Sequence, residues 1–310
     1  MAEVTKRQHY VPRFVVQNFA DNAGLVHVYD SESNRVLPPA KPEQSMMQNF
    51  FYDRDNVVEK YLASVEAPAA TILRDFMKTG QVPKAPIERL PFLRFLGLQM
   101  ARTPAARKEH EELVRKFLME FVGTLAKRNG FSQKDLDGII LEHNNPEALH
   151  AGRIALADLS SYLLSDLECR LLLNITDEPF VLGDHPVIFY NWYTKDLDQP
   201  TATSMAGHGV QVIMPLSPNH AIFLYDAKVY DVDGKPNEPV DVPSVRDAAI
   251  MNSLQLLNRE RFVLAASPKQ AEAVRGLAAK LAPGSLTKFS TGVMPASARA
   301  RPQPRMGIHS

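Results

Sequence analysis

Cysteine is almost absent from this chain of 310 residues, in which Cys169 is the single thiol. One thiol cannot form an intramolecular disulfide or a multi-thiolate zinc site, and this usage is typical of a reducing compartment. Net charge is also absent, because 35 basic and 35 acidic residues cancel. The chain therefore has no overall positive field to hold nucleic acid by counterion release, and its single tryptophan, Trp192, makes base stacking a minor option.

Long apolar runs are missing as well. The longest, such as LLLNI at 171–175, are far shorter than the roughly 18–20 residues that cross a bilayer. The first residues lack the apolar stretch of about 7–15 residues that a signal peptide needs. With 45% hydrophobic and 23% charged residues, the composition is that of an ordinary globular protein. We therefore expect a soluble, cytoplasmic protein that does not enter a membrane.

Several catalytic motifs cannot be found in the sequence. It contains no P-loop, no dinucleotide-binding GxGxxG, no HExxH and no GxSxG nucleophile elbow. These absences argue against a P-loop nucleotidase and a standard serine hydrolase.

The patterns that are present predict an α+β fold. At the start, LVHVY at 25–29 and RVL at 35–37 flank a turn and predict a hairpin, and 50–53 predicts a third strand. Helical spacing of apolar residues follows, and Pro68 predicts a kink or a break in the first of these helices. Pro104 is expected to separate two others. The predicted helical ranges are 56–78, 86–103, 105–129, about 132–143 and 146–168.

After residue 167 the pattern changes to short β-like runs. CRLLLNIT, FVLGD, PVIFYN, GVQVIMPL and HAIFLYD predict a mainly antiparallel second sheet, with covering helices at about 243–258 and 269–282 and the strand RFVLAAS between them. We interpret 1–290 as a single domain with an N-terminal part (1–55), a helical region (56–168) and a sheet with helices (169–290). The Pro- and Arg-rich residues 291–310 are expected to be a disordered tail.

The segment QHYVPRFVVQNF at 8–19 is the most informative part of the chain. If Pro12 starts a helix, Arg13 and Gln17 share a face while His9 precedes the first turn, and such a cluster suits an anion. Gln8 and Asn18 add amide groups. The alternative is that the aromatic residues fix the arm to the sheet and that the polar groups bond buried partners.

Two further segments carry candidate residues. FVLGDHPVIF at 180–189 predicts strand, turn and strand, with Asp184 and His185 at the turn, where Asp followed by Pro is also a common structural device. In LQMART, Gln99 and Arg102 share a helical face, and Arg102 suits either an anion or an internal carboxylate such as Glu66 or Asp184.

Glu66 and Glu59 are seven residues apart on one predicted helical face. Both could point into the same groove if Pro68 does not disrupt the helix, but we favour a salt-bridging surface role for the two.

QHYVPRFVVQNF, followed soon by VHVYD, resembles the start of the DUF4238 family of proteins of unknown function. The resemblance extends through LQMARTP at 98–104, FVLGDHPVIF at 180–189 and MPLSPNHAIFLYD at 214–226. It implies a common organisation and no particular reaction. Where the family often has a Ser-Asp-Asn-Pro turn, this chain has Gly183 to Pro186, with histidine at the asparagine position.

Two hypotheses on function follow. In the first, the protein is a hydrolase acting on a phosphodiester or another anionic substrate. His9 is a general base or metal ligand, Asp184 and His185 help to hold a divalent ion, and Arg13 or Arg102 stabilises negative charge. In the second, Gln8, Asn18, Gln99 and the same cluster bind a small anion or a protein partner without chemistry. Both predict that His9, Arg13, Arg102 and Asp184 meet in one cleft.

Overall fold

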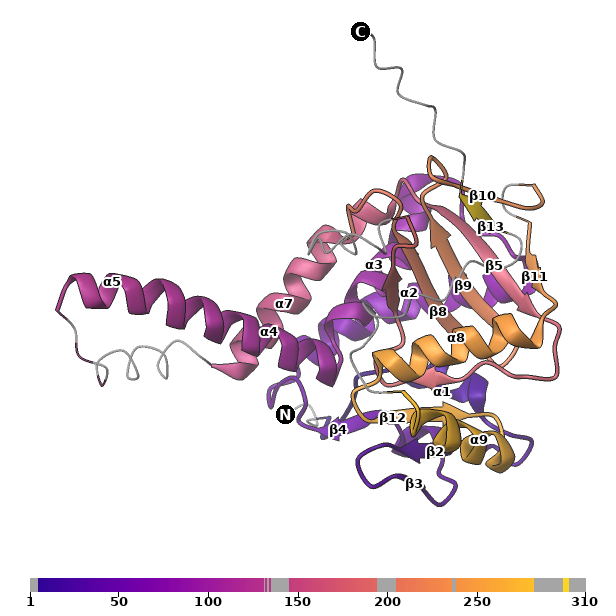
Figure 1. Cartoon of the computed structure of the whole chain (residues 1–310), viewed down its shortest axis with the longest axis horizontal. Coiled ribbons are helices and arrows are strands. Elements are labelled where there is room, and N and C mark those ends of the chain that lie inside the picture. Colours follow the sequence, from indigo (N-terminus) through magenta and orange to yellow (C-terminus); the bar gives the residue numbers. More distant parts are fainter. Residues whose placement is uncertain are drawn as a thin grey trace, which may run out of the picture.

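A computed structural model of the chain describes residues 5–130, 132, 134, 145–193, 205–235, 238–281 and 298–300. Its elements form an α+β fold, which confirms the predicted class. Figure 1 shows a five-stranded sheet between helices, a smaller sheet below it, and α4 and α5 extending away as an arm.

The N-terminal segment forms a strand, a short helix and a two-stranded sheet. β1 Arg7–His9 pairs antiparallel with β4 Met47–Asn49, while α1 Arg13–Val16 and η1 Gln17–Phe19 follow Pro12. The strand predicted at 50–53 is wrong, because Phe50 has a positive φ of 51° that ends β4 and turns the chain. Tyr10, Val11 and Phe19 are buried and fix the segment to the core.

The helical region follows the predicted order. Its helices are α2 Val57–Thr79, α3 Pro86–Ala101, α4 Pro104–Phe117, the π-helical turn η3 Leu118–Val122, α5 Gly123–Arg128 and α7 Pro146–Ser160, with η4 Ser161–Leu164. Pro104 separates α3 from α4 as predicted. Of the kink or break predicted at Pro68, the break is wrong, since α2 continues through this residue. Most of the helix expected at 132–143 lies outside the described residues.

The larger sheet has the strand order β11-β5-β9-β8-β7. β5 Glu168–Asn174, β9 His220–Tyr225, β8 Gln211–Ser217 and β7 Ile188–Tyr190 are antiparallel, as predicted, whereas β11 Val240–Val242 runs parallel to β5. Alternate residues of β8 point to opposite faces. Val212 and Met214 pack with the cluster of α2 and α3, while Ile213 packs with that of α8 Val245–Asn258. The sheet is thus buried on both faces.

The smaller sheet joins the two ends of the described chain in the order β3-β2-β12-β6. β2 His27–Asp30 and β3 Arg35–Val36 form the predicted hairpin, and β12 Phe262–Ala265 lies between β2 and β6 Leu182–Gly183. FVLGD was expected in the larger sheet, and this is corrected by the pairing of β6 with β12. α9 Pro268–Ala278 packs on this sheet through Val274.

At the C-terminal end, β13 Ala298–Ala300 pairs antiparallel with β10 Tyr230–Val232. The other residues of the expected tail lie outside the described part. Within that part, none of the helices has the length and apolar character needed to span a bilayer.

Candidate functional site

Gln8 is locked inside the protein. Its Nε2 donates to the Asp53 backbone oxygen at 2.9 Å and to Asp53 Oδ1 at 3.0 Å, and its Oε1 accepts from the Tyr52 amide at 2.7 Å. Asp53 Oδ2 also accepts from the amide of Val58 in the first turn of α2. Gln8 therefore joins β1 to the chain entering α2.

Arg102 is the centre of the polar interior beside β1. It lies just after α3 and is 3% exposed. Its Nε donates to the Tyr52 hydroxyl at 2.9 Å, one terminal nitrogen pairs with Glu66, and the other donates to the His9 backbone oxygen at 2.5 Å. Arg102 thus contacts the backbone of the His9 segment, and of its two suggested carboxylate partners, Glu66 and Asp184, it pairs with Glu66. All three nitrogens donate within the protein.

The other residues of the N-terminal motif point elsewhere. Asn18 donates to the Leu216 backbone oxygen at 2.9 Å, which fixes η1 to β8. Arg13 is 56% exposed at its side chain and lies 4.0 Å from Glu43. Arg13 thus does not share the contacts of Arg102.

Asp184 and His185 lie at the junction of β6, β12 and α4. Asp184 accepts hydrogen bonds of 2.8 Å from the amides of Glu260, Arg261 and Phe262. Burial raises the pKa of Asp184 to about 6, and the three backbone hydrogen bonds oppose this rise. These contacts fix the start of β12, and the predicted contact of Asp184 with His9 and Arg13 is not among them.

His185 is tied to the start of α4. Its Nδ1 lies 2.6 Å from the hydroxyl of Thr103, the N-cap of that helix. Burial lowers the pKa of His185 to about 4, so the ring is neutral near pH 7.

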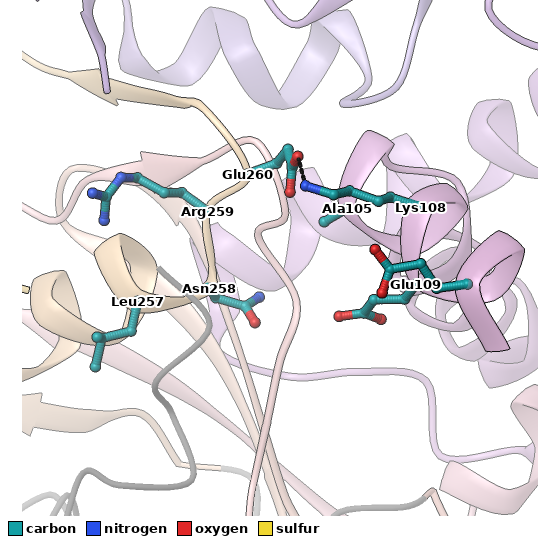
Figure 2. A pocket seen from close by; sticks show the side chains of 8 residues that line it. Ala105, Lys108, Glu109, Leu257, Asn258, Arg259 and Glu260 are labelled. Carbon is teal, nitrogen blue, oxygen red and sulfur yellow. Dashed lines mark hydrogen bonds and ion pairs between the residues drawn. The ribbon is translucent and has the colours of Figure 1, made fainter. Parts of the chain in front are cut away.

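A shallow groove of about 280 Å³ lies next to this junction, between α4 and the segment joining α8 to β12. Figure 2 shows the Lys108–Glu260 ion pair, 2.9 Å long, reaching across it. The Arg259 guanidinium points away from the α4 wall. Asn258, also on the lining, donates to the backbone oxygen of His185. The groove is lined by both acidic and basic side chains, and Lys108 and Glu260 at its edge already pair with each other.

Unpartnered polar atoms gather around Tyr52 and Arg102. Gln99 donates from Nε2 to the Tyr10 backbone oxygen at 2.9 Å, which leaves its buried Oε1 without a partner. The His150 ring stacks parallel to Tyr52 with 5.6 Å between centroids, and neither of its nitrogens has a partner. The other atoms of this kind here are His9 Nε2 and Glu59 Oε2. Buried polar groups are rarely left this way, so the cluster marks a candidate site.

The two half-buried titratable groups of the cluster have shifted pKa values. Burial lowers the pKa of His9, although Glu66 opposes this effect. Burial raises the pKa of Glu59 to about 7, against the nearby Arg102. Near neutral pH, His9 is therefore a free base, and Glu59 exchanges its proton readily.

The sequence signalled only part of this cluster. The seven-residue spacing placed Glu59 and Glu66 on one face of α2. The predicted salt bridge is found for Glu66, but its partner is the buried Arg102 and not a surface residue. Tyr52 and His150 were missed because nothing in their local sequence distinguishes them from other core residues. Their partners come from distant parts of the chain.

The described part of the chain shows no metal site. Within the described ranges, no three His, Cys, Asp or Glu side chains come together in a group that could hold one. The divalent ion considered from the sequence therefore has no identified ligand set here.

The fold and the cluster define an α+β protein with a buried polar site at the junction of its N-terminal strand and its helical layer. A family model described as "Protein of unknown function (DUF4238)" matches residues 7–269, so the chain belongs to the DUF4238 family. No curated protein and no solved structure matches it.

Proposed function

We propose that the cluster of His9, Glu59, Glu66, Tyr52 and Arg102 is the acid–base site of a hydrolase. The observation that carries the proposal is the pair of buried, unpartnered atoms, His9 Nε2 and Glu59 Oε2, beside one ion pair. Two titratable groups shifted in opposite directions are typical of sites that transfer protons.

We assign each group a role on the basis of its contacts. The backbone of Glu43 accepts a hydrogen bond from the His9 ring, and Nε2 is left as the acceptor that takes a proton from water. Glu59 retains a proton near neutral pH and donates it to the leaving group. Arg102 holds the backbone of His9 and is a positioning residue.

Two expectations from the sequence remain proposals. One is a phosphodiester or other anionic substrate. The nitrogens of Arg102 are engaged internally, and Arg13 is 56% exposed and lies 4.0 Å from Glu43, so these contacts give that substrate little support. The other is a cytoplasmic setting. It is supported by Cys169, whose thiol is buried and has its pKa raised to about 12 by that burial.

The test uses Glu59→Gln and His9→Gln with a broad panel of chromogenic esters, amides, glycosides and phosphodiesters. Loss of a general acid or base is expected to lower kcat/KM by at least about 100-fold. Glu88→Gln is the matched control, since Glu88 also lies in the first turn of a helix, is exposed and is outside the cluster.

The pH profile adds a second readout. Activity is expected to rise as His9 loses its proton, below pH 6.5, and to fall as Glu59 ionises near pH 7. Folded variants that turn over a substrate as fast as the unchanged protein would contradict the proposal.

A binding or sensor module is the second candidate, because the same unpartnered atoms can hold a ligand without chemistry. It becomes the better account if no member of the panel is hydrolysed while a ligand binds and Glu59→Gln weakens its binding.

A further inference from the structure

The charges of the cluster compensate one another. Glu66 pairs with Arg102, and both are held in place by their neighbours. Asp53 accepts from the first turn of α2, where the helix dipole favours a carboxylate. His9 and His150 carry no charge near neutral pH, and Glu59 is uncharged below pH 7, where it holds its proton. Below pH 7, therefore, neither an anion nor a cation finds an unpaired opposite charge among these residues.

The hydrogen-bonding capacity of the cluster is not compensated. Gln99 is fully buried, and its Oε1 is identified as the free acceptor because Nε2 bonds Tyr10. His150 is 1% exposed, and its neutral ring offers one further acceptor and one donor. His9 Nε2 and the carbonyl oxygen of protonated Glu59 are also acceptors.

We propose that this site takes an uncharged ligand rich in hydrogen-bond donors, of the polyol or amide class, with Gln99 and His150 as its buried anchors. The inference rests on the proposed function, for which it names the substrate class. Such a ligand satisfies the free acceptors without bringing a charge into the interior, where an unpaired charge costs several kcal/mol.

The residues of the cluster closest to solvent are His9 and Glu59, which are both half-buried, and Glu66, whose side chain is 24% exposed. We expect a ligand to enter from their side. Behind them, Tyr52 and His150 close the interior as a stacked pair. The reacting bond therefore lies near His9 and Glu59, while donors of the ligand reach inward to Gln99 and His150.

The test is ligand-observed NMR on the full chain. The uncharged probes are glucose, N-acetylglucosamine, mannitol and N-methylacetamide, and the charged probes are glycerol 3-phosphate, phenyl phosphate and agmatine. At least one uncharged probe is expected to show saturation transfer, unaffected by 0.5 M NaCl, while the charged probes show none.

His150→Phe separates a ligand contact from a structural role. It keeps the ring and removes two unpartnered nitrogens, so the fold is expected to keep or gain stability. Transfer to the bound probe is expected to fall at least tenfold. Gln211→Leu is the matched control, because Gln211 is also fully buried with an unpartnered amide but lies on β8, outside the cluster.

Three results overturn the inference. The first is binding of the charged probes alone, and the second is undiminished binding of an uncharged probe to the His150→Phe variant. The third is the absence of saturation transfer to every uncharged probe, which would mean that the cluster holds buried water only. The proposed function fails separately. If uncharged probes bind and nothing is hydrolysed, the proposed hydrolase function is wrong and the proposed ligand class stands. If phosphodiesters alone are turned over, the hydrolase function stands and the proposed ligand class is wrong.

Discussion

Arg102 connects three parts of the chain through one guanidinium group. Its partners are the backbone of His9 in β1, Glu66 in α2 and Tyr52 in the loop that precedes α2. Because the side chain is almost fully buried, the removal of either charge leaves the other without compensation.

Arg102→Met is therefore expected to destabilise the protein by about 3–5 kcal/mol, as is typical of breaking a buried ion pair. Urea unfolding measures this change, and a double-mutant cycle with Glu66→Gln isolates the pairwise part. Arg74→Met, at an exposed pair 4.0 Å long, is the control and should change stability by less than about 0.5 kcal/mol. Equal effects at the two sites would contradict the role of Arg102.

Two buried histidines give stability a defined pH dependence. Burial lowers the pKa of His150 to about 3 and that of His185 to about 4, below the unperturbed 6.5. Below pH 6.5 the unfolded chain binds protons that the folded chain excludes, so stability falls as pH falls from 6.5 toward 4 and is unaffected by these groups above 6.5.

The stability lost by pH 5 is expected to be roughly 1–2 kcal/mol for His150. His150→Phe should remove that part of the loss, and thermal unfolding at pH 5 and pH 7 measures it. His208→Gln, at a side chain that is 63% exposed, is the control. A variant with the full acid sensitivity of the unchanged protein would exclude His150 as the cause.

At the scale of elements, α2 shows that packing can override a local signal. Pro68 lacks the amide that would bond the Ser64 carbonyl, yet the helix continues because Leu62, Val65, Ala69 and Leu73 are buried on one face. The prediction of a break considered only the local energetic cost of proline and not the packing of the helix.

Pro68→Ala is accordingly expected to stabilise the protein by about 1–3 kcal/mol, because it restores a helical hydrogen bond at an exposed position. Thermal and urea unfolding measure this gain. Ala67→Ser, which changes no backbone donor, is the comparison. A loss of stability would mean that the proline shapes the helix for a contact that alanine cannot keep.

Asp184 holds the start of β12 through three backbone hydrogen bonds. Asp184→Asn removes the charge and replaces one acceptor oxygen by an NH2 group, which cannot accept from a backbone N–H. We therefore expect the free energy of unfolding to fall by about 2–4 kcal/mol. Exposed Asp177→Asn in the preceding turn should be nearly neutral. Hydrogen exchange of the Glu260, Arg261 and Phe262 amides reports the local effect, and unchanged protection would contradict it.

At the scale of the whole molecule, an early strand, β2, pairs with a late one, β12. Asp30 and Arg261 form two hydrogen bonds of 2.8 Å across the paired strands β2 and β12, although they are 231 residues apart. The smaller sheet is complete only when both ends of the described chain are present.

One cooperative unfolding transition is therefore expected, in line with the interpretation of 1–290 as one domain. Trp192, the single tryptophan, packs against the larger sheet beside α8 and reports on that sheet, while circular dichroism reports on the helices. Coincident urea curves from the two signals are the expected result. Separate midpoints would show that the parts unfold independently.

Sequence patterns predicted the class, most of the helices and the hairpin, because these depend on local periodicity. They also suggested that Arg102 lies near His9 and could pair with Glu66. They did not predict the pairing of β1 with β4, of β6 with β12, or the stacking of His150 on Tyr52. These contacts join segments that are distant along the chain, and local patterns carry no information on which segments meet.

The central place of β12 has a consequence for synthesis in the cell. β2 leaves the ribosome early, but its partner Phe262–Ala265 is among the last described segments to be made. Until then β2 has an unpaired edge, and such edges recruit other chains. We expect nascent chains that stop before residue 262 to need chaperone protection, and release of the complete chain to end that need.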